Sequence, residues 1–291
     1  MSHPPWRLLA LVGVSAALVL VPLAMSSSSK ARGGHTAQTL VARAPAGEAP
    51  APHTQCAGPP PGPADAGFEA QVVKLVNAQR RAAGLPPLKR VERLTESARW
   101  FARDMASQHY FAQDHDTYYR ERGHLVRACD WSARIAWYYP QWTALAENIA
   151  AGYQTPEEAV AGWMSSPGHR AKILGHGHWE TGAGYWAGGS EGHYWVEDFG
   201  RRSGVFPLVI DDEAGSTASP RVSLYVYGSW REMRLRNDDQ PFGPWRTFSN
   251  AFDWTLDDTP GTRTVTVEMR DGGKAASSSD SIELGRPQPP T

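Results

Sequence analysis

The chain reads Ala146-Glu147-Asn148-Ile149-Ala150-Ala151-Gly152 and, after a helical stretch, Trp163-Met164-Ser165-Ser166-Pro167-Gly168-His169-Arg170-Ala171-Lys172-Ile173-Leu174. One carboxylate and one imidazole therefore stand in apolar, turn-rich surroundings, each next to a predicted helix. A small cleft that binds a metal or moves a proton needs fixed groups of different basicity. The pattern makes Glu147 and His169 the first candidates for a functional site.

Apolar periodicity predicts four helices around this stretch. The first runs from Phe68 to the stop signal Gly84-Leu85-Pro86, and the second covers about residues 94–108. The third opens at Thr155-Pro156-Glu157-Glu158, with Thr as N-cap, Pro at the first helical position and Glu three residues after the cap. The fourth starts at Ser166-Pro167 and ends at Gly175.

Two strands are predicted at residues 181–186 and 192–199. Helices segregated against a small antiparallel sheet predict an α+β sandwich. The run Gly182-Ala183-Gly184-Tyr185-Trp186-Ala187 fits a dinucleotide-binding fingerprint, but it lies inside a predicted strand and opens no helix. We therefore reject a nucleotide site there.

The motifs Glu-Asn-Ile-Ala and Trp-Met-x-Ser-Pro-Gly-His-Arg, with Tyr-Trp-Val-Glu-Asp-Phe-Gly further on, closely resemble the bacterial branch of the CAP superfamily. This superfamily contains cysteine-rich secretory proteins, antigen 5 and pathogenesis-related protein 1, and its domain is also called SCP. The resemblance runs from about Phe68 to Gly200. It implies an α-β-α sandwich, independently of the periodicity.

The resemblance also implies a cavity lined by two His and two acidic residues. Glu147 and His169 match two members of this tetrad. The third usually follows a Phe as Phe-x-His, whereas this chain has Gln113 there; His115, or else His109, is the expected substitute. The fourth member, a Glu shortly before the second His, has no match. A zinc site built from His115, Glu147 and His169 would lack one ligand and leave room for water, as catalytic zinc sites do.

A purely structural interpretation of these residues stands beside the functional one. Glu147 and Asn148 could cap loops through hydrogen bonds to backbone amides. His169 could be a packed histidine that donates to a carbonyl. Arg170 is expected to be a structural hydrogen-bond donor.

The N-terminus indicates export. Arg7 precedes an apolar run over residues 8–25, which would span roughly 27 Å as a helix, slightly less than a bilayer core of about 30 Å. Small residues at Ala24 and Ser26 are compatible with cleavage. Residues 1–25 are therefore predicted to be a signal peptide or an N-terminal membrane anchor, and both place the remainder outside the cytoplasm.

The two cysteines are consistent with export, because Cys56 and Cys129 form an even pair without metal or redox spacing. We expect a disulfide between them, although Cys129 could instead be a plain buried thiol. Residues 26–67, rich in Ala, Pro, Gly and Ser, are predicted to be a disordered tether to the domain at 68–204.

Alternating apolar runs separated by turn signals predict a second, all-β module at residues 205–285, similar to immunoglobulin-like sandwiches. The four runs lie at residues 222–227, 233–236, 264–269 and 281–284. Residues 286–291 are predicted to be a disordered tail. The module contains no clustered nucleophile or metal-ligand set, so we interpret it as a spacer or adhesion module.

The net charge of -1 gives no argument for nucleic acid or an anionic membrane as partner. Three functions are compatible with the sequence. The first is an extracellular or surface-anchored protein that binds a lipid, sterol-like or cell-wall ligand around Glu147 and His169. The second is a zinc-dependent hydrolase with His115 and His169 as ligands and Glu147 as ligand or general base. The third is a non-catalytic adhesion scaffold. The sequence favours the first.

Overall fold

The computed structural model describes residues 42–43 and 56–285. The predictions for residues 1–25, for most of the tether and for the tail at 286–291 fall outside these residues. Within the described ranges, none of the helices combines the length and the apolar character needed to cross a bilayer.

A five-stranded sheet forms the centre of the first part of the chain, with the order β1-β5-β7-β6-β2. Its strands are β1 (Ala42–Arg43), β2 (Lys89–Arg90), β5 (Trp142–Ala151), β6 (Glu180–Gly188) and β7 (Gly192–Arg202). The two predicted strands are present as β6 and β7. The strand β5, which carries Glu147, escaped the pattern because it is rich in Ala, a poor strand former, and buried on both faces.

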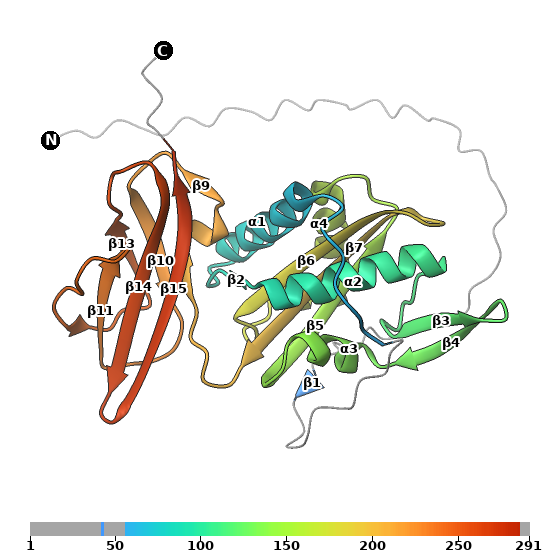
Figure 1. The fold of residues 1–291 in the computed structure, drawn as a ribbon, viewed down its shortest axis with the longest axis horizontal. Coiled ribbons are helices and arrows are strands. Elements are labelled where there is room, and N and C mark those ends of the chain that lie inside the picture. The colour runs from blue at the N-terminus through green and yellow to red at the C-terminus, as the bar shows by residue number, and fades with distance from the viewer. Residues whose placement is uncertain (1–41, 44–55, 286–291) are drawn as a thin grey trace, which may run out of the picture. The chain divides into compact units, whose positions relative to one another are not determined.

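Helices cover both faces of this sheet. On one face, α2 (Glu92–Gln108) and α3 (Trp131–Tyr138) pack against a cluster that includes Phe101, Ile149 and Val196. On the other face, α1 (Ala66–Ala82), α4 (Pro156–Ser165) and α5 (Pro167–Ile173) bury Val73, Trp163 and Trp195. Figure 1 shows α2 running along β6 and β7. The predicted α-β-α sandwich is confirmed.

The helix starts follow their sequence signals. The Thr155 side chain accepts a hydrogen bond from the Glu158 amide at 3.3 Å, directly before Pro156. The Asp65 carboxylate accepts from the Phe68 amide at 2.9 Å, so α1 begins two residues earlier than the periodicity indicates. Such caps satisfy backbone donors that have no partner within the helix.

Gly182 and Gly184 allow α2 to lie close to β6. A Cβ atom on Gly182 would stand 2.1 Å from the Thr95 amide nitrogen, and one on Gly184 would stand 2.1 Å from that of Arg99. No side chain larger than hydrogen fits at either position without moving the helix. Helix packing therefore explains the glycine pattern that resembles a nucleotide fingerprint.

The hairpin of β3 (Thr117–Glu121) and β4 (His124–Cys129) carries the expected disulfide. Cys129 is bonded to Cys56, with the two Cα atoms 5.6 Å apart. Next to this bond, Gly58 accepts a hydrogen bond from the Tyr138 hydroxyl at 2.6 Å. The last part of the predicted tether, from residue 56 to the start of α1, is thus bonded to the sandwich, and β1 adds two tether residues to the edge of the sheet.

The C-terminal part is all β, as predicted. One sheet has the order β13-β10-β8, and the other has the order β12-β11-β14-β15-β9. Apolar residues of both sheets, including Leu224, Val226, Val265 and Val267, form one core. The elements are β8 (Leu208–Ile210), a short 3-10 helix (Asp211–Glu213), β9 (Ser216–Thr217), β10 (Arg221–Val226), β11 (Glu232–Asn237), β12 (Arg246–Thr247), β13 (Ala251–Thr255), β14 (Gly261–Asp271) and β15 (Lys274–Leu284).

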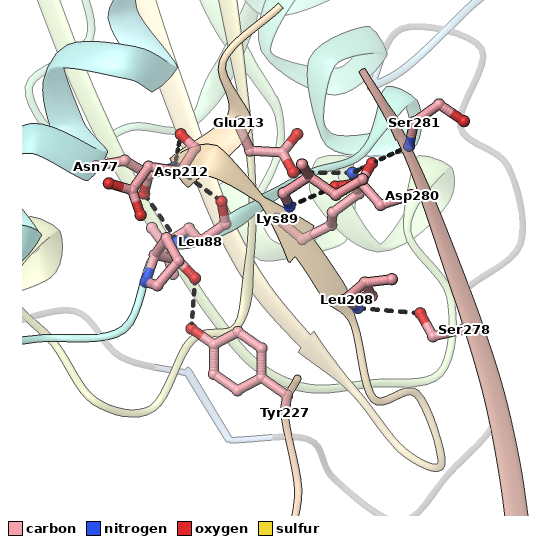
Figure 2. Close-up of polar contacts among 12 residues, drawn as sticks. Asn77, Leu88, Lys89, Leu208, Asp212, Glu213, Tyr227, Ser278, Asp280 and Ser281 are labelled. Atoms are coloured by element: carbon pink, nitrogen blue, oxygen red, sulfur yellow. Dashed lines mark hydrogen bonds and ion pairs between the residues drawn. The ribbon is translucent and has the colours of Figure 1, made fainter. Parts of the chain in front are cut away.

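Polar contacts connect these sheets to the α-β-α part (Figure 2). The Lys89 ammonium lies 2.8 Å from a Glu213 carboxylate oxygen and also pairs with Asp280. The Tyr227 hydroxyl donates to the Pro87 carbonyl at 2.8 Å. Because Lys89 is largely buried between two carboxylates, its ion pairs are screened less by solvent than those of an exposed surface pair.

Candidate functional site

Glu147 lies in the middle of β5, and its side chain is held on both oxygens. Its Oε1 lies 2.9 Å from Nδ1 of His115, and its Oε2 pairs with the Arg134 guanidinium. Glu147 is 2 % exposed and Arg134 is 0 % exposed. Arg134, on α3, also lies with its guanidinium carbon 3.4 Å from the centre of the Phe101 ring. A fixed, buried ion pair therefore forms the centre of the site.

The loop after α2 brings His115 to this carboxylate. His115 has a left-handed backbone with φ of 66°, and its carbonyl accepts from Arg134 at 3.0 Å. The other positions that the sequence offered, His109 and Gln113, are exposed. The structure thus places His115 next to Glu147, with His115 in a left-handed backbone conformation.

His169 lies in the first turn of α5, close to the same cluster. Its carbonyl accepts a hydrogen bond from the Asn148 side chain at 3.2 Å, and its ring is half-buried. Burial, followed by the positive charge of Lys172 and the neighbouring His115, lowers the pKa of His169 to about 4. At neutral pH the His169 ring is therefore uncharged. It is the most accessible ionisable side chain of the cluster.

The motifs did not indicate two further members of the cluster, Arg134 and Lys172. Lys172 donates from its ammonium to the backbone carbonyl of Glu147 at 2.6 Å, and it is 5 % exposed. Both residues lie on helices where a cation would ordinarily face solvent. Their burial depends on tertiary packing, which a single sequence does not reveal.

Asp198 on β7 stands directly opposite Glu147 on β5. Burial, together with the negative charge of Glu147, raises the pKa of Asp198 well above its usual range. For Glu147, burial alone would act in the same direction, but Arg134 and His115 outweigh it and lower the pKa of Glu147 to about 2. Of the two carboxyl groups, Glu147 is therefore the stronger acid, and Asp198 holds a proton more readily. The sequence did contain a hint of Asp198, because the apolar run Trp-Val-Glu-Asp-Phe includes two acidic residues, which are unusual in a buried strand.

The donor set does not fit the zinc site considered from the sequence. Within residues 42–43 and 56–285, no three His, Cys, Asp or Glu side chains are placed to hold a metal ion together. Arg134 occupies one oxygen of Glu147 and puts a positive charge where a cation would bind. His115 contacts Glu147 through Nδ1 alone, so a zinc ion could use only its Nε2 and would find one oxygen of Glu147 already paired with Arg134. We derive no reaction step through a metal here.

The ionised state of Glu147 predicts a pH effect on stability. Its pKa of about 2 lies below the usual 4.5, so it contributes stability that is present above pH 4.5 and is lost as the pH falls towards 2. The difference in urea midpoint between wild type and Glu147→Gln should therefore be largest at pH 7 and shrink between about pH 5 and 2. The exposed Glu191→Gln variant serves as the control. A difference that stays constant with pH would contradict the ion pair.

Known proteins also combine an α-β-α sandwich with the sequence motifs that supply the His–Glu pair and the second His of this site. Residues 73–199 match the CAP family, the cysteine-rich secretory protein family. The chain is 37% identical over 132 residues to the uncharacterized protein YkwD of Bacillus subtilis (strain 168). The matched region covers 45% of this chain and 46% of that protein. The chain thus spans about half the length of this curated relative.

Two solved structures resemble part of the chain. One is an extracellular protein containing an SCP domain from Bacillus anthracis str. Ames, with 25% identity, 47% of this chain and 41% of that chain covered, and a TM-score of 0.39. The other is an outer surface protein from Borrelia burgdorferi, with 17% identity, 46% and 91% covered, and a TM-score of 0.40. Residues 73–199, a little under half of the chain, thus resemble the CAP family and its bacterial relatives.

Proposed function

We propose that this protein is an exported CAP-domain binding protein that holds a small apolar or cell-envelope ligand around Glu147 and His169. The observation that carries the proposal is the double occupancy of the Glu147 carboxylate by His115 and Arg134. A carboxylate held in this way fixes the positions of His115 and Arg134. Export is supported by the disulfide between Cys56 and Cys129, because such bonds persist in oxidising compartments.

The charges of the cluster favour a ligand with a hydrogen-bond-accepting head group. Arg134 and Lys172 are basic groups, although burial lowers the pKa of Lys172, whereas Glu147 supplies one negative charge and the pKa of Asp198 is raised. The half-exposed ring of His169 offers a neutral hydrogen-bonding group. An amphiphile with an acidic or carbonyl head and an apolar body satisfies this arrangement.

Acid–base catalysis is less well supported by the same groups. A general base works best with a pKa near the operating pH. Glu147, with a pKa of about 2, is a weak base, and the protonated Asp198 is 0 % exposed. These properties favour binding over the hydrolase alternative.

Titration with a fluorescent fatty acid, cis-parinaric acid, tests the proposal on the purified full-length protein. We expect saturable binding to the wild type and a loss of affinity of about tenfold or more in His169→Ala, which is the size expected from removing one buried polar contact. The exposed His124→Ala variant should bind as the wild type does.

The titration tests the binding proposal, and separate turnover and adhesion assays test the two alternatives. Absence of saturable binding, or equal affinity of the His169→Ala and wild-type proteins, would overturn the proposal. Turnover of cell-wall material that disappears in both Glu147→Ala and His169→Ala would support the hydrolase. Adhesion without any ligand would support the scaffold.

A further inference from the structure

Two cavities that the CAP tetrad does not use share the walls Trp179, Arg201 and Phe206. One has a volume of about 470 Å³ and the other about 450 Å³. The second is also lined by Tyr225, Tyr227 and Asn250 from the all-β part. Their volumes lie in the range of small-molecule sites, which is about 300–1,000 Å³.

Arg201 is a cation without a carboxylate partner among the residues the structure describes. Its guanidinium carbon lies 3.6 Å from the centre of the Trp179 ring. Its neighbour Arg202, in contrast, pairs with Glu180. Burial lowers the pKa of Arg201, as expected for a charge that no anion compensates. An arginine left in this state on a cavity wall is a natural anchor for an anionic ligand.

His178 lines the second cavity and is 2 % exposed. Its two ring nitrogens are buried, with the Leu145 backbone as a neighbouring polar group, so the ring contributes to the wall by packing. Burial and the charge of Arg80 lower its pKa to about 4, which leaves the ring neutral at pH 7.

The remaining walls are aromatic and basic. Trp179 stacks on Tyr227 with ring centres 4.9 Å apart, and Phe206 lies 5.9 Å from Trp179. Arg80 lines the second cavity, and neither cavity is lined by an Asp or Glu side chain. The walls thus combine positive charge, rigid apolar rings and neutral hydrogen-bonding groups.

We infer that this double cavity binds an anionic saccharide, with its carboxylate or phosphate on Arg201 and its ring against the aromatic walls formed by Trp179, Phe206 and Tyr227. The positive charge of Arg201 selects an anionic group, and the aromatic walls favour a sugar ring over a simple inorganic ion. This site is separate from the one around Glu147 and His169, so either can exist without the other.

Calorimetry on the full-length protein with matched sugars tests the inference. The probes are glucuronate and glucose 6-phosphate, with glucose as the neutral match and inorganic phosphate as the match without a sugar ring. We expect at least one anionic sugar to bind at least about tenfold more tightly than both matches, since one charge-assisted contact is worth about that factor. Arg201→Gln should remove this preference, whereas the exposed Arg231→Gln should keep it.

The outcomes separate the sources of binding. A carboxylate requirement follows if only glucuronate binds, and a phosphate requirement follows if only glucose 6-phosphate binds. Equal binding of glucose, equal binding of inorganic phosphate, or no binding of any sugar would overturn the inference. If Arg201→Gln does not fold, the comparison of the anionic sugars with their matches on the wild-type protein still tests the inference. Fatty-acid binding lost in His169→Ala is independent of all these results.

Discussion

Arg134→Met is expected to lower the free energy of unfolding by about 3–5 kcal/mol, because it leaves the buried Glu147 carboxylate without its cation. The guanidinium also donates to the His115 carbonyl and to the Thr117 hydroxyl at 3.1 Å, so both lose a partner. Urea unfolding at pH 7 measures the change. Arg93→Met, at an exposed position on the neighbouring helix α2, is the matched control and should change stability by less than about 0.5 kcal/mol.

A double variant separates lost packing from the uncompensated charge. Arg134→Met with Glu147→Gln removes both charges, and replacing a whole buried pair costs much less than breaking it. The double variant should therefore be more stable than Arg134→Met alone. If the single change costs under about 1 kcal/mol, the carboxylate does not depend on Arg134, and our description of the site is wrong.

Removing the disulfide through Cys56→Ala with Cys129→Ala is expected to cost about 4 kcal/mol in the chain-entropy model, for a separation of 73 residues. Part of the effect should be local. The disulfide holds Cys56 at the β4 end, next to the hydrogen bond between Tyr138 and Gly58. Thermal unfolding of the oxidised and the double-variant proteins tests both points.

Protease sensitivity identifies where the loss occurs. We expect early cleavage between residues 56 and 65 in the double variant, because few other contacts hold this segment to the sandwich. An unfolding midpoint equal to that of the wild type would show that the segment is held by other contacts.

Local signals in the sequence were sufficient for α1, α2, α4 and α5 and for much of the sheets, whereas the helix α3 was not predicted. Thr155 and Pro156 begin α4 where the capping pattern places it, since an N-cap depends on neighbouring residues alone. The strand β5 could not be predicted in this way. Its short side chains, such as Ala146 and Ala150, are favoured by the helices packed on them, and that packing is a long-range effect.

The residues of the candidate site could likewise be predicted only in part from the sequence. Motif resemblance indicated Glu147 and His169, and the two are brought into one cluster. His115 reaches the cluster because its backbone adopts a left-handed conformation, which no propensity in the loop predicts. Arg134 sits in an ordinary helical pattern, so only the folded chain reveals that its charge is buried.

Native mass spectrometry of the full-length protein, incubated with a lipid extract and with zinc, tests the central claim most directly. We expect one organic ligand bound per wild-type chain, absent from His169→Ala and retained in His124→Ala. We also expect no stoichiometric zinc, because Arg134 occupies the carboxylate that the metal would need. A single bound zinc that disappears in both Glu147→Ala and His169→Ala, with no organic ligand, would contradict the account.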